Sequence, residues 1–531
     1  MRPILIKSIK NFLTPLKPIV FRRNYVDIGK IPFHLVSIPD QENPSFLDVV
    51  VYNYHKARLI VENKLIAQLQ PMWTETIARP EREEKARGIL SAMEDPESVL
   101  EINFPIRMDD GNYIMHSGFA VHYKAYNVPV VVPVRFGLDM TRGKTTALAK
   151  LMTYKCGFGH IPFGGGSAGL VIDRRKYSQK EMRRVTRQFA SELVIRGFVG
   201  PNIGIVSPDK GVQPKEMNYI LTMYRRTYGY SDIHASTLVT GRKPLKFQQN
   251  INSVAGGFIA CLEYLISKES LMSKHKLTTT LEGKTYISQG CGKLALQIAS
   301  VLSNKGSKLI AVQSTKGSII NKNGIDVKSL IKYRIKHGNI IGFPGAEAYK
   351  GENVLFEPCD IILLAATHLL INGAIASKIN AKVVAELANA PITPSGDKAL
   401  IRKNVLIIPD ILANAGQLTV SYIEWLQKMY PVNNMILRYK RMTDYDTLKS
   451  IEDSLQRQAY KVQIQPKPDI VERAKGIKYG EMEWVGLMGI TEQNCQRVIN
   501  IADQYQLGPD LRTAAHIGAI LHIFGELSNR L

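Results

Sequence analysis

The stretch at residues 161–170, IPFGGGSAGL, combines three consecutive glycines with one polar side chain, that of Ser167. Glycine has no Cβ, so a loop of this kind lets the backbone or a short side chain come very close to a ligand. The group presented is a serine hydroxyl, which carries no charge and, without an activating partner, is a weak base near neutral pH. The stretch therefore predicts a ligand-binding loop without a strong acid–base group.

A lysine stands where the sequence expects an apolar side chain. The pattern at 145–157, TTALAKLMTYKCG, predicts a helix in which Leu148, Leu151, Met152 and Lys155 share one face. A lysine on such a face either finds a counter-charge, from the protein or from a bound anion, or extends its ammonium group to solvent. Extension to solvent is the most common outcome, and the sequence leaves the alternatives open.

A second glycine turn predicts a nucleotide-binding fold. It reads Gly290-x-Gly292-x-x-Ala295 and lies between an expected strand at 284–288 and an expected helix. Gly290 allows a tight turn, and Gly292 allows a pyrophosphate to reach the N-terminus of the helix. Ala295 lets the helix pack closely on the strand.

The acidic residue that usually holds the ribose is missing. The fingerprint expects it about 20 residues later, at the end of the second strand. That strand ends here with Gln313, Ser314, Thr315 and Lys316. Either Lys316 favours a phosphorylated ribose or the ribose contact has been lost.

The elements that must position these groups indicate an α/β protein. PVVVPVRF at 129–136 predicts a buried strand. From 241 to 430 strands alternate with helices, the pattern of a parallel sheet. Residues 436–485 are typical of an inserted, charged helical hairpin, and 511–527 predict a terminal amphipathic helix. The further expected strands lie at 307–313, 360–366, 381–387 and 404–410.

Length and composition restrict the function classes. A chain of 531 residues with 45% hydrophobic and 22% charged residues predicts two or three soluble domains. No apolar run reaches about 18 residues, so no membrane span is predicted. The five scattered cysteines, without a CxxC pair, argue against a disulfide scaffold or a zinc site and fit a reducing compartment, and no metal site is predicted.

The formal net charge of +23 has two possible sources. Residues 1–26 contain six lysines and arginines and no acid, the composition of a mitochondrial transit peptide at 1–25, the alternative being a basic tail. The other basic residues are spread along the chain, without a long basic stripe or an aromatic stacking motif. We therefore predict a mitochondrial matrix location and no nucleic-acid partner.

The chain resembles the animal-type mitochondrial glutamate dehydrogenase family, within the Glu/Leu/Phe/Val dehydrogenases, over essentially its whole length after the leader. The resemblance is carried by LMTYKC, PFGG, ASELVIRGFVGP, SPD, GNIIGFP, ANAPITP, IPDILANAGQLTVSYIEW and LRTAA. It implies a homo-hexamer that oxidises L-glutamate to 2-oxoglutarate and ammonia with NAD or NADP. It also implies a substrate domain, a Rossmann-type coenzyme domain, a helical antenna and C-terminal helices at 26–240, 241–435, 436–485 and 486–531.

Two lysines of the family's site are missing. The family's glycine-rich loop reads G-G-x-Lys-x-G, and the position of its catalytic lysine, a base and hydrogen-bond donor, is Ser167. The lysine that holds the side-chain carboxylate of glutamate begins the motif Lys-Gly-Gly-Ile-Arg, and its position is Val131. The two glycines of that motif have become Val132 and Pro133. The sequence thus resembles a divergent paralogue with an altered pocket.

The other site residues of the family are retained on the substrate side. By resemblance, Lys155 holds the α-carboxylate and Asp209 exchanges protons with the substrate nitrogen, although Asp209 could instead simply pair with Lys155. Ser421 matches a serine that contacts the side-chain carboxylate, and Asn389 and Asn414 match asparagines that line the cleft. On the coenzyme side, Ser314 stands at the position of the family's ribose-binding glutamate. Val254 stands at the position of the threonine that faces the nicotinamide.

Three functions are consistent with this pattern. The first is a catalytically impaired glutamate dehydrogenase paralogue, kept for assembly or regulation and co-assembling with active chains. The second is an active glutamate dehydrogenase in which Lys210 or Lys124 replaces the missing amine. The third is a dehydrogenase or binding protein for a more apolar amino acid, because Val131 suits an uncharged side chain. The clustering of the losses in one cleft favours the first.

Overall fold

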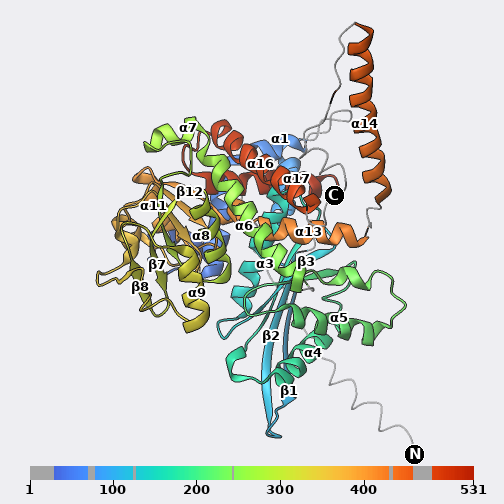
Figure 1. Ribbon diagram of the computed structural model, residues 1–531. Coiled ribbons are helices and arrows are strands. Elements are labelled where there is room, and N and C mark those ends of the chain that lie inside the picture. Colours follow the sequence, from blue (N-terminus) through green and yellow to red (C-terminus); the bar gives the residue numbers. More distant parts are fainter. Residues whose placement is uncertain are drawn as a thin grey trace, which may run out of the picture.

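The computed structural model describes residues 29–69, 78–123, 127–241, 244–366, 368–429, 434–458, 464 and 481–530, with the backbone alone at 244–254, 434–445 and 481–483. These residues form two β-sheets covered by helices, with one long helix projecting from the body (Figure 1). The predicted α/β class is confirmed, whereas the leader predicted at 1–25 lies outside the described residues. No helix in the described ranges is both long and apolar enough to cross a membrane.

The first sheet has the strand order β1–β2–β4–β3–β5. β3 lies near its centre and pairs in parallel with β4 and with β5, whereas β1 and β2 form an antiparallel pair at one edge. The strand predicted at 129–136 is confirmed as β3, which is buried along almost its whole length. In chain order, β1 to β5 are Ser98–Arg107, Tyr113–Tyr123, Val130–Phe136, Gly164–Leu170 and Gly204–Pro208.

Helices cover both faces of this sheet. Helix α3, Arg142–Phe158, packs on one face, where Val131 of β3 shares a core with Leu148 and Leu151. Helices α4, Gln179–Ile195, and α5, Pro214–Tyr228, pack on the other, where alternate β3 residues meet them. This alternation explains why β3 is apolar at nearly every position: its two faces are buried in different cores.

The second sheet has the order β12–β11–β10–β6–β7–β8–β9. Its first five strands are parallel, as the alternating sequence pattern predicted, and β8 and β9 add an antiparallel edge that the pattern did not predict. Helix α8, Lys293–Asn304, follows β6 as expected. In chain order, β6 to β12 are Thr285–Gln289, Lys308–Ser314, Gly317–Ile320, Glu347–Ala348, Ile361–Leu364, Val383–Glu386 and Leu406–Ile408.

The remaining helices differ widely in how far they are buried. The projecting helix in Figure 1 is α14, the first half of the predicted hairpin, and most of the returning half lies outside the described residues. The last helix, α17, was predicted to be amphipathic, but its first ten residues are all buried between α1, α3 and α16. The bounds are α1 Phe46–Gln68, α2 Arg79–Glu94, α6 Pro244–Ile266, α7 Glu269–Met272, α9 Val327–His337, α10 Gly373–Lys378, α11 Pro394–Arg402, α12 Asp410–Ala413, α13 Gly416–Met429, α14 Asn434–Arg457, α16 Glu481–Gln504 and α17 Leu511–Ser528.

Helix α3 carries a buried lysine on the side away from the cleft. The Nζ atom of Lys150 donates a hydrogen bond of 2.9 Å to the carbonyl oxygen of Glu94 and lies 5.2 Å from the centre of the Tyr54 ring. Burial lowers the pKa of Lys150 to about 8, and the charge of Glu94 offsets only part of this effect. Because an unfolded lysine titrates near pH 10.4, the charged form of Lys150 destabilises the fold at neutral pH.

We expect Lys150→Met to remove a pH dependence of stability. Between about pH 8 and 10.4 the unfolded chain binds more protons at this position than the folded chain, so the wild-type protein gains stability as the pH rises. The free energy of unfolding of the variant relative to wild type should therefore fall by about 2 to 3 kcal/mol from pH 7 to pH 10. Urea titrations at both pH values measure this difference. Lys332→Met, on the exposed side of α9, should show no such change, and an equal response of both variants would contradict the assignment.

Candidate functional site

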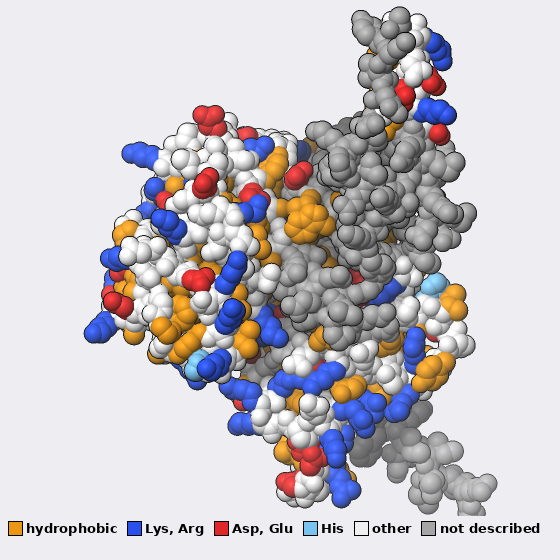
Figure 2. Space-filling model, in the orientation of Figure 1, with side chains coloured by type: hydrophobic (Ala, Val, Ile, Leu, Met, Phe, Trp, Pro, Cys, Tyr) orange, Lys and Arg blue, Asp and Glu red, His pale blue; other side chains and the backbone are white. Residues whose placement is uncertain are grey.

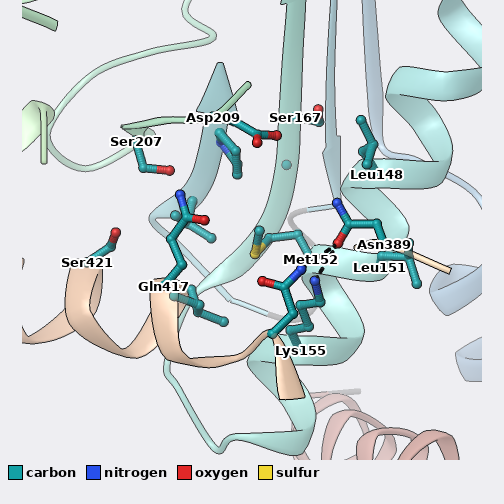
Figure 3. Close-up of a pocket in the computed structure, with 15 residues that line it drawn as sticks. Leu148, Leu151, Met152, Lys155, Ser167, Ser207, Asp209, Asn389, Gln417 and Ser421 are labelled. Carbon is teal, nitrogen blue, oxygen red and sulfur yellow. Dashed lines mark hydrogen bonds between the residues drawn. The ribbon is translucent and has the colours of Figure 1, made fainter. Parts of the chain in front are cut away.

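The residues singled out on the substrate side of the sequence gather around one pocket between the two sheets, with an empty volume of about 620 Å³ (Figure 3). They come from β3, from the middle of β4, from the residue after β5, from α3, from the loop after β11, from the segment that enters α13 and from α13 itself. All seven line the pocket: Val131, Lys155, Ser167, Asp209, Asn389, Asn414 and Ser421. The fold thus brings together groups separated by almost 300 positions.

Lys155 is buried at the floor of this pocket. Its Nζ atom donates a hydrogen bond of 2.7 Å to Oδ1 of Asn389, and Nδ2 of Asn414 donates to the same oxygen at 3.2 Å (Figure 3). The expected extension to solvent is wrong, because the loop after β11 covers this face of α3. Burial lowers the pKa of Lys155, partly offset by the charges of Asp410 and Asp209. Within the described part of the chain Lys155 forms no ion pair, so its remaining donors suit an anion.

Asp209 has a different partner from the one considered for it. The carboxylate, just after β5, accepts hydrogen bonds from the guanidinium of Arg135 at 3.0 and 2.9 Å. Its other oxygen accepts a bond of 2.7 Å from the backbone amide of Lys210. The alternative that Asp209 pairs with Lys155 is therefore wrong, because the fork of Arg135 reaches it from the neighbouring strand. Asp209 still lines the pocket and faces it with an acceptor.

The glycine-rich stretch is a strand and not a loop. Gly164–Leu170 form β4, and a Cβ at Gly165 would overlap Thr153 of α3, while one at Gly166 would lie 2.6 Å from Val130. These glycines let the strand pack against its own neighbours. Ser167 is buried and lines the pocket, and its hydroxyl forms no hydrogen bond with any residue that the structure describes. The serine is therefore not activated by a base there.

One wall of the pocket is apolar. Val131 and Pro133 of β3 lie beside the side chains of α3 that the helical pattern had grouped, and Leu418 joins them; the wall consists of Val131, Pro133, Leu148, Leu151, Met152 and Leu418. Gln417 was missed from the sequence, although it precedes Ser421 by four residues on α13 and so shares its helical face. Its Nε2 atom donates to the carbonyl oxygen of Pro208 at 2.8 Å.

A larger cleft of about 1790 Å³ opens beside the pocket and shares Asp209, Asn389, Asn414 and Ser421 with it. The N-terminus of α8 lines this cleft with Gly292, Lys293 and Ala295. Gly290 has φ +110°, and a Cβ there would lie 2.8 Å from the carbonyl oxygen of Ala365, so the tight turn needs glycine.

The cleft suits a dinucleotide. Gly292 faces open space, and a Cβ added there would have no atom within 4 Å of it, which leaves room for phosphate oxygens to reach the first turn of α8. Arg135, Lys210 and Lys293 supply positive charge, and Asp209 is the only acidic residue among the described lining side chains. Lys293 was inside the fingerprint but was not singled out from the sequence.

The geometry gives no support to the coenzyme contacts considered for Ser314 and for Val254. Ser314 does not line the cleft: its hydroxyl donates to the carbonyl oxygen of Gly317 at 2.8 Å and accepts from the amide of Lys316 at 3.2 Å, so it stabilises the turn between β7 and β8. The side chain of Val254 lies outside the described residues.

A buried charge network fixes the loop that carries Asn389. Arg512 of α17 donates to both carboxylate oxygens of Glu386 at 2.8 and 2.7 Å and to Asp397 at 3.0 Å. Asp410 accepts a bond of 2.9 Å from the amide of Ala390, the residue after Asn389. Burial raises the pKa of Glu386 to about 7, and the charge and hydrogen bonds of Arg512 oppose this effect.

Comparison with known proteins identifies the family. The family model for Glutamate/Leucine/Phenylalanine/Valine dehydrogenase matches residues 263–477, and the model for the dimerisation domain of these enzymes matches 96–226. The mitochondrial glutamate dehydrogenase of Dictyostelium discoideum is 33% identical over 346 residues, which cover 64% of this chain and 68% of that protein. The chain belongs to the Glu/Leu/Phe/Val dehydrogenase family.

Other members of the family agree with this assignment. The glutamate dehydrogenase of Thermotoga maritima is 34% identical over 337 residues, covering 63% of this chain and 78% of the relative. The hetero-hexameric glutamate dehydrogenase of Thermus thermophilus, solved with leucine bound, has the same fold, with a TM-score of 0.70 and 22% identity over 92% of this chain and 99% of that one. Glutamate dehydrogenases of this family use NAD or NADP.

We expect Arg512→Met to destabilise the protein strongly. The substitution leaves the carboxylates of Glu386, Asp397 and Asp410 buried without their cation, a change that costs about 3–5 kcal/mol in comparable networks. Chemical denaturation followed by circular dichroism measures the loss. Arg402→Met, exposed at the end of α11, should cost less than about 1 kcal/mol. Similar losses for the two variants would show that the network does not stabilise the fold.

Proposed function

We propose that this protein is a catalytically impaired glutamate dehydrogenase that retains the pocket and coenzyme cleft of its family without the full catalytic machinery. The observation that carries the proposal is the lining of the substrate pocket. Among the described residues, Lys155 is its only basic side chain, and Ser167 and Val131 occupy the positions where the resemblance places two further lysines. The family reaction converts L-glutamate, water and NAD(P)⁺ to 2-oxoglutarate, NH₄⁺ and NAD(P)H.

The retained residues can still bind part of such a substrate. In this proposal the N–H groups of Lys155 that do not donate to Asn389 hold the α-carboxylate of the substrate. Asp209 accepts a proton from the substrate nitrogen. Gly292 and Lys293 would hold the pyrophosphate of the coenzyme, which supplies the hydride acceptor when bound. Asn389 and Asn414 lie where pocket and cleft meet, and so would orient the two ligands toward each other.

The missing groups weaken the reaction more than the binding of coenzyme. A hydroxyl at Ser167 cannot give or take a proton as an amine of lowered pKa does, and general acid–base catalysis is worth roughly 10²–10⁴-fold. Val131 cannot form the charge-assisted bond to the distal carboxylate of glutamate, which removes about 1.5–3 kcal/mol of binding. The lost acid–base group and the lost carboxylate contact both reduce the conversion of glutamate.

A replacement amine finds little support. Lys210 follows Asp209 in the chain but lines the outer cleft and not the inner pocket. Its charge acts on Lys144 and Asp139, neither of which lines the pocket. Lys124 lies outside the described residues. An active glutamate dehydrogenase that uses one of these lysines is therefore the weaker alternative.

The apolar wall favours a second candidate function. Five aliphatic or sulfur-containing side chains and Pro133 line the pocket, and one of them, Val131, stands where the resemblance places the lysine for the distal carboxylate of glutamate. An amino acid with an apolar side chain fits this wall while its α-carboxylate reaches Lys155. A dehydrogenase or binding protein for such an amino acid is the alternative to an impaired glutamate dehydrogenase.

We further propose that the protein acts in the mitochondrial matrix as a subunit of a hexamer, alone or mixed with active glutamate dehydrogenase chains. The acid-free, basic composition of residues 1–25 and the mitochondrial relative from Dictyostelium support the location. The intact sheets and cores support a role that depends on assembly, and the relative from Thermus is itself a hetero-hexamer. In this role the chain contributes a folded subunit with a modified site.

We expect the purified protein to oxidise L-glutamate at least about a hundredfold more slowly than active family members. Formation of NADH or NADPH, followed at 340 nm with each coenzyme, measures this rate. Ser167→Lys combined with Val131→Lys should raise turnover, because it restores both amines.

The matched control is Ser167→Met combined with Val131→Lys, which adds a side chain of comparable length without the amine and should stay inactive. Wild-type turnover within about tenfold of active relatives would contradict impairment, since a lost acid–base group costs more than that. The same assay with L-leucine, L-valine and L-phenylalanine tests the second candidate, and turnover of one of them above that of glutamate would favour it.

We expect Gly292→Ala to weaken NADH binding at least about tenfold without disturbing the fold. The backbone at Gly292 has φ −62° and ψ 166°, which alanine adopts freely, and the added Cβ would meet nothing but the space reserved for the pyrophosphate. Isothermal titration calorimetry with NADH and NADPH measures the change. Gly489→Ala, which also adds a Cβ in open space, should bind normally. Absence of binding to the wild-type chain at millimolar coenzyme would indicate a purely structural role.

A further inference from the structure

Neutral polar side chains line the end of the substrate pocket between β5 and α13. Ser207 of β5 is buried there, and Gln417 and Ser421 lie about one turn apart on the same face of α13. Figure 3 shows these three side chains on one side of the pocket, across from Leu148 and Leu151 of α3. None of the three carries a charge, so this end of the pocket offers a ligand hydrogen bonds and no ion pair.

The carboxamide of Gln417 is held in one orientation. Its Nε2 atom donates a hydrogen bond of 2.8 Å to the carbonyl oxygen of Pro208, the residue after Ser207. A carbonyl oxygen accepts only from a donor, so this contact turns Oε1 of Gln417 the other way, toward the middle of the pocket (Figure 3). Oε1 accepts no hydrogen bond from any residue that the structure describes. It is therefore an acceptor that a donor on a ligand can satisfy.

Two hydroxyl groups supply donors at the same end of the pocket. The buried hydroxyl of Thr240 donates a long hydrogen bond of 3.5 Å to Oγ of Ser421, which leaves the O–H group of Ser421 able to donate to another atom. The hydroxyl of Ser207 forms no hydrogen bond within the described part of the chain. Because both serines line the pocket, a ligand oxygen there has two donors available in addition to the acceptor of Gln417.

The charges of the inner pocket match an amino acid with a neutral side chain. Figure 2 shows many Lys and Arg side chains on the outer surface over α4 and α5. In the pocket, by contrast, Lys155 and Asp209 are the only charged side chains among the described lining residues. Lys155 suits the α-carboxylate and Asp209 the α-ammonium group, which leaves no cation for a second carboxylate.

The polar end of the pocket disfavours both glutamate and an aliphatic amino acid. A distal carboxylate would lose its hydration without an ion pair and would meet Oε1 of Gln417, which is itself an acceptor. An aliphatic side chain would leave Gln417, Ser207 and Ser421 without hydrogen-bond partners. The ligand that satisfies this end needs a donor and an acceptor on a neutral group.

We propose that the pocket binds an α-amino acid with a terminal carboxamide, of the size of L-glutamine, and that Gln417 selects this ligand over L-glutamate. The amide nitrogen of the ligand donates to Oε1 of Gln417, and the amide oxygen accepts from Ser421 or Ser207. The methylene groups pack on the apolar wall. This inference rests on the proposed function, because it keeps the α-carboxylate at Lys155, and it changes the class of ligand.

Calorimetric titration of the whole chain with L-glutamine, L-glutamate and L-leucine measures this preference independently of turnover. We expect L-glutamine to bind at least about tenfold more tightly than either of the others. Gln417→Met removes the acceptor and keeps a side chain of similar length, so its affinity for L-glutamine should fall at least about tenfold, while its affinity for L-leucine should not fall. The matched control is Gln427→Met, on the same helix but outside the pocket, which should bind L-glutamine as the wild type does.

A further variant places the ligand in the molecule. Lys155→Met should abolish binding of L-glutamine, and retained binding would show that the ligand lies outside the pocket and overturn the proposal. The proposal would also be overturned if the wild-type chain bound none of the three amino acids or bound L-glutamate or L-leucine as tightly as L-glutamine. Equal losses in Gln417→Met and Gln427→Met would do the same.

The titration and the turnover assay fail independently. Slow oxidation of L-glutamate together with preferential binding of L-glutamate would overturn the selection by Gln417 and leave the impaired catalysis standing. Oxidation of L-glutamate near the rate of active relatives would contradict the impairment, whichever amino acid binds most tightly.

Discussion

The burial of the Lys155 ammonium group against an amide oxygen is the constraint on which the pocket depends. A buried charge is costly unless hydrogen bonds compensate for it, and here Oδ1 of Asn389 accepts the hydrogen bond, while the charges of Asp410 and Asp209 offset only part of the cost. Asn389 must therefore keep its oxygen toward Lys155, and Asn414 fixes that orientation by donating to the same atom. A ligand carboxylate would complete the compensation, so the stability of this pocket and its affinity for an anion are physically linked.

The orientation of Asn389 depends in turn on the last helix of the chain. The next residue, Ala390, has φ +38°, a backbone conformation that few residues other than glycine adopt. Its amide donates to Asp410, whose own amide donates to Glu386, and Arg512 of α17 holds Glu386 with two hydrogen bonds. A cation in the C-terminal helix therefore determines the position of a pocket residue more than a hundred positions earlier. The first ten residues of α17, which include Arg512, are accordingly buried on all sides.

Features that depend on local pattern were predictable from the sequence, and features that depend on tertiary contact were not. Strand β3, the parallel strands of the second sheet, the turn at Gly290 and the convergence of Lys155, Asp209 and Asn389 follow from hydrophobic period, glycine spacing and family motifs. The pairing of Asp209 with Arg135 was missed because it requires the register of two neighbouring strands. The glycines before Ser167 suggested a loop. The sequence does not reveal that α3 packs so closely against this strand that there is no room for a side chain at Gly165.

The residues that maintain the fold and those that carry the chemistry tolerate substitution differently. A side chain at Gly165 would collide with Thr153 of α3, so a change there disturbs the packing of β4 on its helix. The side chains of Ser167 and Val131 line the pocket, and a change there alters what the pocket can bind or protonate while the strands keep their backbone pairing. Selection on assembly alone would therefore preserve the first kind of residue and release the second. This difference explains how a chain can keep the architecture of a dehydrogenase family while the groups that would touch the substrate change.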